Sequence, residues 1–251
     1  MKNKIFILVF MVAFLSFSSY SQAKDESDKH SSKLRRWSIS WSTGSTTSRI
    51  AAGIERAMRA SGYGDLEPIF GTPFPYSTGW TGEGLPWTIS IHYLFKPPFL
   101  IGVLISKAMI GKTHGFHYVS NSPSQVGSLI SIDYGVNTYA PVFSVRYSVF
   151  QFGIGPAWYV AKKAWHSDIS GLGQANTINK LGFLADLGIA VPQRRRFYFE
   201  FKVQYRLIGK VEIGPYEDKV QTALGYETVT FPKTGVTYDY LYFGVGVGIR
   251  F

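Results

Sequence analysis

The sequence contains no cysteine. Disulfide bonds therefore do not hold the fold together, although an exported chain could have used them. Beyond residue 23, no apolar stretch approaches the roughly 20 residues that a membrane-spanning helix needs. Acidic residues are scarce, with 16 Asp and Glu against 26 Lys and Arg. Aromatic residues, by contrast, make up 16% of the chain. A chain so rich in rings, with no helix-length apolar run, is expected to bury them on β-strands.

The N-terminal residues have the pattern of a secretory signal peptide. Lys2 and Lys4 supply positive charge, a short apolar run follows at 5–17, and Ser21-Gln22-Ala23 offers small residues for cleavage after Ala23. No cysteine follows the run, which excludes a lipid-modified N-terminus. Residues 24–36 are charged and rich in serine, which predicts a disordered periplasmic lead. We therefore expect a signal peptide at 1–23, this lead at 24–36 and one folded domain at 37–251.

Residues 236–251 show the clearest periodicity in the chain. From Leu241 the odd positions are apolar up to Phe251, and the even positions are mostly glycine before Arg250. A period of two predicts a β-strand with one apolar face and one small or polar face. Similar alternation predicts seven further strands, at 37–43, 87–95, 99–109, 125–137, 149–162, 178–191 and 197–207.

The predicted connections alternate between long and short. Long loops are expected at 44–86, 111–124, 164–177 and 208–235, and short turns at 96–98 and 192–196. This asymmetry is typical of outer-membrane barrels, which have short periplasmic turns and longer outer loops. At 138–148 the apolar positions change from odd, through Tyr147, to even, from Phe150. That change predicts a bulge or bend in place of one continuous strand.

The polar faces of these strands consist mostly of Gly, Ser and Thr, and the apolar faces carry no Lys or Arg. We therefore expect the apolar faces to meet lipid and the polar faces to fill the interior. Centring the tight turn on Arg194 places Asp186 across from Lys202. The expected interior network balances three acids against three bases and favours a salt-bridged plug over an ion path. Its members are Asp133, Asp186, Glu200, Lys202, Arg206 and Arg250.

This pattern, together with the terminal Phe251, resembles the small eight-stranded barrels of Gram-negative outer membranes, the OmpA- and OmpX-like class. The resemblance implies an all-β fold: an eight-stranded antiparallel up-and-down transmembrane β-barrel with one short amphipathic helix in its first extracellular loop. It also implies a location in the cell outer membrane, with Phe251 as a signal for the barrel-assembly machinery. Expected partners are outer-membrane lipid and lipopolysaccharide, whose phosphates suit a basic exported chain. We expect a monomer, with no cofactor, no metal site and no nucleic-acid partner.

The first long loop contains the one good helix signal after the signal peptide. Ser48 can cap it, Gly62 can close it, and its apolar residues recur four apart. The helix is predicted either to pack on the barrel mouth as a lid, or to lie at lipid head groups or a partner. The expected apolar stripe is Ile50, Ile54 and Met58, with Arg49, Arg56 and Arg59 available for phosphates.

Three functions agree with this sequence. The first is a non-enzymatic structural or surface-interaction role through the extracellular loops. The second is a lipid A-modifying acyl hydrolase: His117 to Asn121 resembles the His-x-Ser-Asn signature of lipid A deacylases, but one extra residue separates His117 from Ser120. In a strand that extra residue turns the serine to the opposite face. The third is a narrow channel for ions or small solutes. We favour the first function.

Overall fold

The computed structural model describes residues 36–60, 63–64, 76–77, 85–118, 127–167, 174–191, 195–222 and 225–251. The predicted signal peptide and nearly all of the predicted lead lie outside these residues. Among the residues described, no helix has the length and apolar character needed to cross a membrane.

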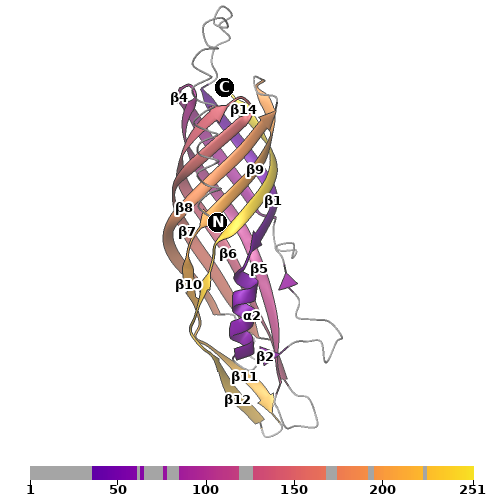
Figure 1. The fold of residues 1–251 in the computed structure, drawn as a ribbon. Coiled ribbons are helices and arrows are strands. Elements are labelled where there is room, and N and C mark those ends of the chain that lie inside the picture. The colour runs from indigo at the N-terminus through magenta and orange to yellow at the C-terminus, as the bar shows by residue number, and fades with distance from the viewer. Residues whose placement is uncertain are drawn as a thin grey trace, which may run out of the picture. The chain divides into compact units, whose positions relative to one another are not determined.

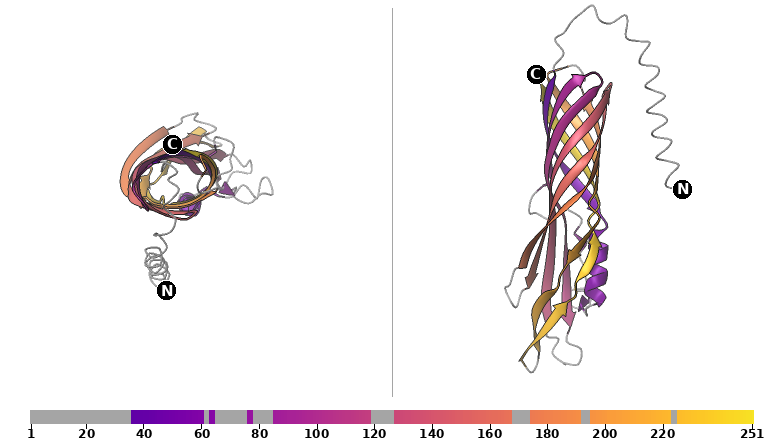
Figure 2. Two further views of the ribbon diagram at one scale, coloured as in Figure 1. Left: turned by 90° about the horizontal axis from the view of Figure 1, so that it is seen from above. Right: turned by 90° about the vertical axis from the view of Figure 1, so that its left-hand side faces the viewer.

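Eight antiparallel strands close into a barrel, as the alternation predicted (Figures 1 and 2). Each strand pairs with the next along the chain, and the last pairs back with the first from Ser38–Arg250 to Ser48–Tyr240. The eight are β1 (Trp37–Ser48), β4 (Trp87–Lys96), β5 (Phe99–Tyr118), β6 (Gly127–Tyr147), β7 (Phe150–Ser167), β8 (Gln174–Val191), β9 (Phe197–Leu207) and β14 (Tyr240–Arg250).

Four neighbouring strands are far longer than a bilayer requires. A tilted strand spans the hydrocarbon in about 9–11 residues. The strands β1, β4, β9 and β14 contain 12, 10, 11 and 11 residues, whereas β5, β6, β7 and β8 contain 20, 21, 18 and 18. The extra residues occupy much of the predicted loops 111–124 and 164–177. Figure 1 shows the four long strands continuing beyond the barrel towards the helix. We call this the loop end, and we call the opposite end, with the short connections and the C-terminus, the turn end.

The connection at 138–148 differs from the prediction. Strand β6 runs unbroken through it, and its register against β7 is the same at Tyr139–Trp158 as at Phe143–Ile154. The change of parity is caused by the two-residue turn at 148–149, because Tyr147 pairs directly with Phe150 and both must lie on one face. The bulge lies instead in β5, between Met109 and Gly111.

The loop end is also folded. Helix α2 (Ile50–Ala60) follows β1, and two short segments, β2 (Tyr63–Gly64) and β3 (Tyr76–Ser77), pair with β5. The expected loop at 208–235 is a long hairpin. Its first ladder joins β10 (Lys210–Ile213) to β13 (Thr234–Thr237), and its second joins β11 (Tyr216–Thr222) to β12 (Gly225–Phe231).

The face that carries the apolar side chains changes along the length of the long strands, from the outer face at one end to the inner face at the other. Towards the turn end of β6, Phe143 and Tyr147 are exposed while Ser144 is buried. Towards the loop end, Tyr134 is fully buried and Asp133 lies on the outer side. The expectation that the apolar face of the predicted strand at 125–137 meets lipid is wrong here, because Ile132, Tyr134 and Val136 on that face point inward.

The exchange occurs between two adjacent rows of outward-facing residues that cross from β5 to β8. The last apolar row joins Ile105, Tyr139, Trp158 and Leu181, all of them exposed. The next row joins Lys107, Asn137, Val160 and Asn179. The barrel is therefore apolar outside on the turn side of this line, and it has an apolar core inside on the loop side.

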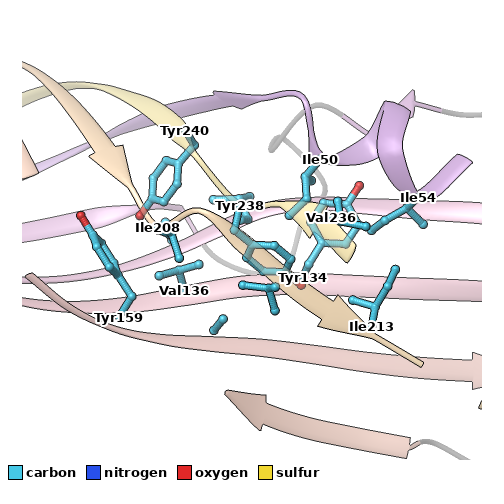
Figure 3. Close-up of a cluster of buried hydrophobic side chains, with 14 of the residues drawn as sticks. Ile50, Ile54, Tyr134, Val136, Tyr159, Ile208, Ile213, Val236, Tyr238 and Tyr240 are labelled. Atoms are coloured by element: carbon cyan, nitrogen blue, oxygen red, sulfur yellow. The ribbon is translucent and has the colours of Figure 1, made fainter. Parts of the chain in front are cut away.

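That apolar core lies between the extended strands, α2 and the hairpin. Figure 3 shows Ile50 and Ile54 of α2 beside Val236 of β13, with Tyr134 and Tyr238 next to them. A Cβ added to Gly53 would meet Cγ1 of Val236 at 3.0 Å, so the helix approaches β13 closely. At the far end, Trp165 stacks on Tyr216 with ring centroids 4.8 Å apart. Together these contacts give the loop end a core like that of a soluble protein.

Candidate functional site

The interior of the barrel on its turn side is the largest concentration of polar chemistry among the described residues. Strand β9 illustrates its origin: its six odd positions are exposed, and its five even positions are buried. A strict period of two therefore delivers a polar side chain to the interior at every second residue. The inward residues of β9 are Tyr198, Glu200, Lys202, Gln204 and Arg206.

Lys202 lies at the middle of this interior and is almost completely buried. Its ammonium nitrogen is 3.1 Å from Oε1 of Glu200. It also donates to Oγ of Ser90 over 2.7 Å and to Oγ of Ser40 over 3.3 Å. Ser40 of β1 and Ser90 of β4 thus accept hydrogen bonds from a buried cation that one carboxylate alone would not satisfy.

Asp186 has a different partner from the one predicted. The β8–β9 register places it across from Gln204, and it places Lys202 across from Gly188. Nε2 of Gln204 donates to Oδ1 of Asp186 over 2.8 Å. The turn between the strands is thus displaced by one residue from Arg194, which moves every cross-strand partner by two.

Arg206 closes the interior on its loop side. Its side chain is fully buried, although a guanidinium is among the groups that proteins bury least often. The guanidinium carbon lies 5.1 Å from the ring centroid of Tyr240 and 5.5 Å from that of Tyr242. The guanidinium donates to Ser106 and Gln204, and to Thr138 over 3.1 Å, Thr88 over 3.2 Å and Tyr240 over 2.5 Å.

The turn end of the interior contains a further cation that sequence reasoning missed. Arg146 of β6 donates to Oε1 of Gln151 over 2.9 Å, and Nε2 of Gln151 lies 3.1 Å from Nε2 of His92. Arg250 of β14 lies over the ring of Tyr198, 4.1 Å from its centroid. Arg146 was overlooked because it fell in the stretch that was expected to bend. Correct recognition of the turn at 148–149 would have placed it inside.

The interior is not balanced in charge, contrary to the prediction. Asp133 does not belong to it, because the odd positions of β6 face outward. This leaves Asp186 and Glu200 as its acids. Its bases are Arg146, Lys202, Arg206 and Arg250. The excess positive charge is stabilised by hydroxyl, amide and aromatic partners in place of carboxylates.

The predicted loop helix is present, and its stripe packs inward. Ile50 and Ile54 are fully buried, while Arg49, Arg56 and Arg59 are exposed. The side chain of Met58 lies outside the described residues. Oγ of Ser48 accepts a hydrogen bond from the amide of Ile50 over 3.4 Å, as a helix cap does. The helix thus lies against the core of the loop end, and its basic side chains face away from that core.

The backbone of His117, one of the two weak catalytic candidates, lies far from the apolar belt. On β5, His117 is twelve residues beyond Ile105, and its backbone pairs with Tyr63 and Ser128. At about 3.3 Å per residue the separation is roughly 40 Å along the strand. The side chain of His117 and the whole of Ser120 lie outside the described residues. Among the described residues, no group of three His, Asp or Glu could hold a metal ion.

Phe251 closes the chain at the turn end. Its backbone exchanges two hydrogen bonds with Trp37, over 2.9 and 3.0 Å, and its ring is half exposed. The first and last strands are therefore joined up to the final residue. The assembly role expected for Phe251 stays a prediction.

No protein-family model matches the chain, and no curated protein does. Solved structures are similar to it. Neisserial surface protein A is 12% identical, with a TM-score of 0.36 over 86% of this chain and 97% of the other. A major outer-membrane protein of Thermus thermophilus is 10% identical, with a TM-score of 0.49 over 86% and 98%. OprG of Pseudomonas aeruginosa is 13% identical, with a TM-score of 0.41 over 86% and 96%. With its closed ring of eight antiparallel strands, the described part of the chain is an eight-stranded antiparallel β-barrel.

Proposed function

We propose that this protein is an integral outer-membrane barrel with a side-chain-filled interior and a non-enzymatic role in surface interaction through its folded loop end. The observation that carries the proposal is the exchange of polarity along β5 to β8. A strand that faces hydrocarbon needs apolar side chains outside, and a strand that faces water needs them inside. The line between Tyr139 and Asn137 is therefore the expected edge of the bilayer.

The apolar belt on the turn side of that line has the composition that lipid requires. In the described residues, every strand contributes exposed apolar side chains, including Trp41, Phe152, Phe201 and Val245. Among the same residues, no charged side chain faces outward between the turn end and the line. One Lys or Arg at the midplane of a bilayer would cost about 2–4 kcal/mol. Trp87 and Trp158 lie at the margin, where aromatic rings are favoured in interfacial belts.

The filled interior supports a closed barrel over a channel. Lys202 and Arg206 are buried in successive layers, and Arg206 alone hydrogen-bonds side chains of β4, β5, β6, β9 and β14. The apolar core of the loop end then covers the Arg206 layer. A hydrated ion would have to displace both.

The loop end supports surface interaction. It has its own core, and it carries Arg49, Arg56 and Arg59 at exposed positions, while the exposed Lys233 is paired with Glu212 over 2.7 Å. Such a surface suits anionic groups, and lipopolysaccharide phosphate is the nearest source in an outer leaflet. The lipid A hydrolase alternative receives no support from the position of His117.

Two measurements test this proposal. Planar bilayers that contain the purified protein should show no stable conductance, whereas Arg206→Ala should admit ions, and Tyr205→Ala, on the lipid side of the same strand, should stay closed. A large stable conductance of the unaltered protein would reject the closed barrel. Labelling of intact cells with an impermeant amine reagent should modify Lys233 and spare Lys96. The reverse pattern would reject the proposed orientation.

A further inference from the structure

Basic side chains gather at the turn end, at the margin of the apolar belt. Arg36 precedes β1, Lys96 ends β4, and Arg195 and Arg196 precede β9. All four are exposed. The sheet order β4–β1–β14–β9 makes these strands neighbours, so the four cations belong to one stretch of the barrel rim. We call this stretch the basic rim, defined by these four residues.

The basic rim has little negative charge to balance it. Among the described residues, the acidic side chains nearest to the turn end are Asp186 and Glu200, and both are buried inside the barrel. In the same part of the chain, no rim cation forms an ion pair with a carboxylate side chain. The terminal carboxylate of Phe251 lies at the end of β14, between β1 and β9. One carboxylate among four cations leaves the rim positive.

Arg36 extends towards the outer face of the wall. Its Nη1 donates to the phenol oxygen of Tyr93 over 3.4 Å, and the ring of Tyr93 lies against that of Trp37 with centroids 4.8 Å apart. Trp37 and Tyr93 occupy outward positions of β1 and β4. The carbonyl oxygen of Arg36 also accepts a hydrogen bond from the amide of Leu94 over 2.7 Å. A guanidinium is thus held beside two rings of the apolar belt.

Arg196 has a similar arrangement at the start of β9. Its guanidinium carbon lies 5.9 Å from the ring centroid of Phe197, the first outward residue of that strand. Its carbonyl oxygen accepts a hydrogen bond from the amide of Arg250 over 2.7 Å, which joins it to β14. Only β14 separates β1 from β9, so the two arginines are about 10 Å apart at the level of the backbone.

A guanidinium next to an outward ring matches the two parts of a phospholipid near its head group. The guanidinium can donate two parallel hydrogen bonds to a phosphate. Aromatic rings are favoured at the level of the head groups, where one side is apolar and the other is wet. A zwitterionic phospholipid also brings a cation of its own, which the four rim cations would repel. The rim therefore favours a phospholipid with net negative charge.

We propose that the basic rim is a binding site for anionic phospholipid in the leaflet at the turn end. Arg36 and Arg196 bind the lipid phosphate, and Trp37 and Phe197 contact the glycerol and the adjoining part of the acyl chains. In the proposed orientation this is the leaflet that faces the periplasm. The site lies at the opposite end from the surface role proposed above, and it requires only that the barrel spans a membrane.

The test compares two pairs of exposed arginines. Arg36→Ala with Arg196→Ala removes two charges from the rim, and Arg49→Ala with Arg56→Ala removes two charges from helix α2 at the loop end. Each folded protein is placed in nanodiscs made mostly of phosphatidylcholine with a minor share of phosphatidylglycerol. Native mass spectrometry of the released protein then measures how many molecules of each lipid stay bound. Both leaflets have the same composition, so the result does not depend on orientation.

We expect the unaltered protein to retain phosphatidylglycerol in preference to phosphatidylcholine. One basic side chain beside an anionic surface strengthens association about fivefold, so the rim variant should lose at least this factor of preference. The α2 variant should keep the preference of the unaltered protein. Equal retention of the two lipids by the unaltered protein, or equal preference in the rim variant and the unaltered protein, would overturn the proposal. A loss in the α2 variant as large as that in the rim variant would also overturn it.

Two further measurements use the unaltered protein alone. Added salt should weaken the preference for phosphatidylglycerol, because exposed charges are screened. A preference that does not change with salt would contradict a role for the rim cations. Glycerol phosphate, the soluble head group without acyl chains, should displace little bound lipid. Complete displacement at a concentration equal to that of the lipid would mean that the rim takes a free phosphate ester and that the rings add nothing.

Discussion

Gln204 holds Asp186 across the β8–β9 ladder through a hydrogen bond of 2.8 Å from Nε2 to Oδ1. The amide thereby occupies the position that a cation would take in a cross-strand salt bridge. Lys202 consequently pairs with Glu200, two residues away on the same face of the same strand, at 3.1 Å. The central ion pair is thus determined by the period of β9 and does not depend on the register between strands.

Removal of the carboxylate from this pair should destabilise the barrel. Glu200→Gln leaves the ammonium of Lys202 buried with hydroxyl partners and a more distant acid. Breaking a buried pair in this way typically costs about 3–5 kcal/mol. Urea unfolding of the barrel in detergent micelles, followed by the mobility of the folded band, measures the loss. The double variant Glu200→Gln with Lys202→Met should recover much of it, and a double variant as unstable as the single one would contradict the pairing.

A charged side chain should destabilise the folded protein when it lies in the apolar belt. On the outer side of the same wall beyond the belt it should have little effect. Phe201→Arg places a guanidinium near the middle of the belt, where the expected cost is about 2–4 kcal/mol. Asn137→Arg, which also faces outward but lies beyond the last apolar row, should cost little. Folding free energies in phospholipid vesicles compare the two variants directly. Equal costs would show that both positions share one environment.

Packing of helix α2 should stabilise the loop end without adding to the stability of the barrel. Ile54 is fully buried beside β13, and truncation to alanine at such a site costs about 2–5 kcal/mol. We expect Ile54→Ala to speed amide exchange in α2 and β13 and to leave exchange in β9 and β14 unchanged. Arg56→Ala, on the exposed side of the helix, is the control. Faster exchange throughout the barrel would mean that the two ends unfold together.

Close approach of β6 and β7 beside Pro141 should make Gly155 intolerant of a side chain. In Gly155→Ala the added methyl group would meet the carbonyl oxygen of Pro141 at 1.9 Å, so the strands must separate. Gly188→Ala is the matched control, since the atom nearest to its added methyl group, Oε1 of Glu200, lies 3.6 Å away in ordinary contact. Thermal unfolding should show a lower midpoint for Gly155→Ala alone. An unchanged midpoint would mean that the wall relaxes freely at this point.

The sequence predicted the barrel well because period-two alternation is a local signal. Strand β9 begins and ends where its alternation does, and the inward positions of Glu200, Lys202, Arg206 and Arg250 follow from the same rule. The position of Arg206 was predictable in this way. Its partners on four other strands were not, because they depend on the curvature and stagger of the closed wall.

The predictions from the sequence were wrong where a single strand faces two different environments along its length. Along β6, Tyr134 and Phe143 have opposite parity and are both apolar, because one faces the core of the loop end and the other faces the belt. With lipid assumed throughout, Tyr134 was placed outside and Asp133 inside. The loop-end core itself arises from α2 and the β10–β13 hairpin, whose approach to the long strands leaves no local pattern.

Strand β6 turns its apolar side chains outward into the apolar belt at one end and inward to a core at the other. Nitroxide labels at single cysteines on outward positions of β6 report this directly in vesicles, through collisions with oxygen and with a water-soluble nickel complex. We predict that labels at Phe143 and Tyr139 respond to oxygen and that labels at Asn137 and Asp133 respond to nickel, with the change between residues 139 and 137. Oxygen-dominated collisions that continue to residue 133, or nickel-dominated collisions at residue 143, would contradict this arrangement.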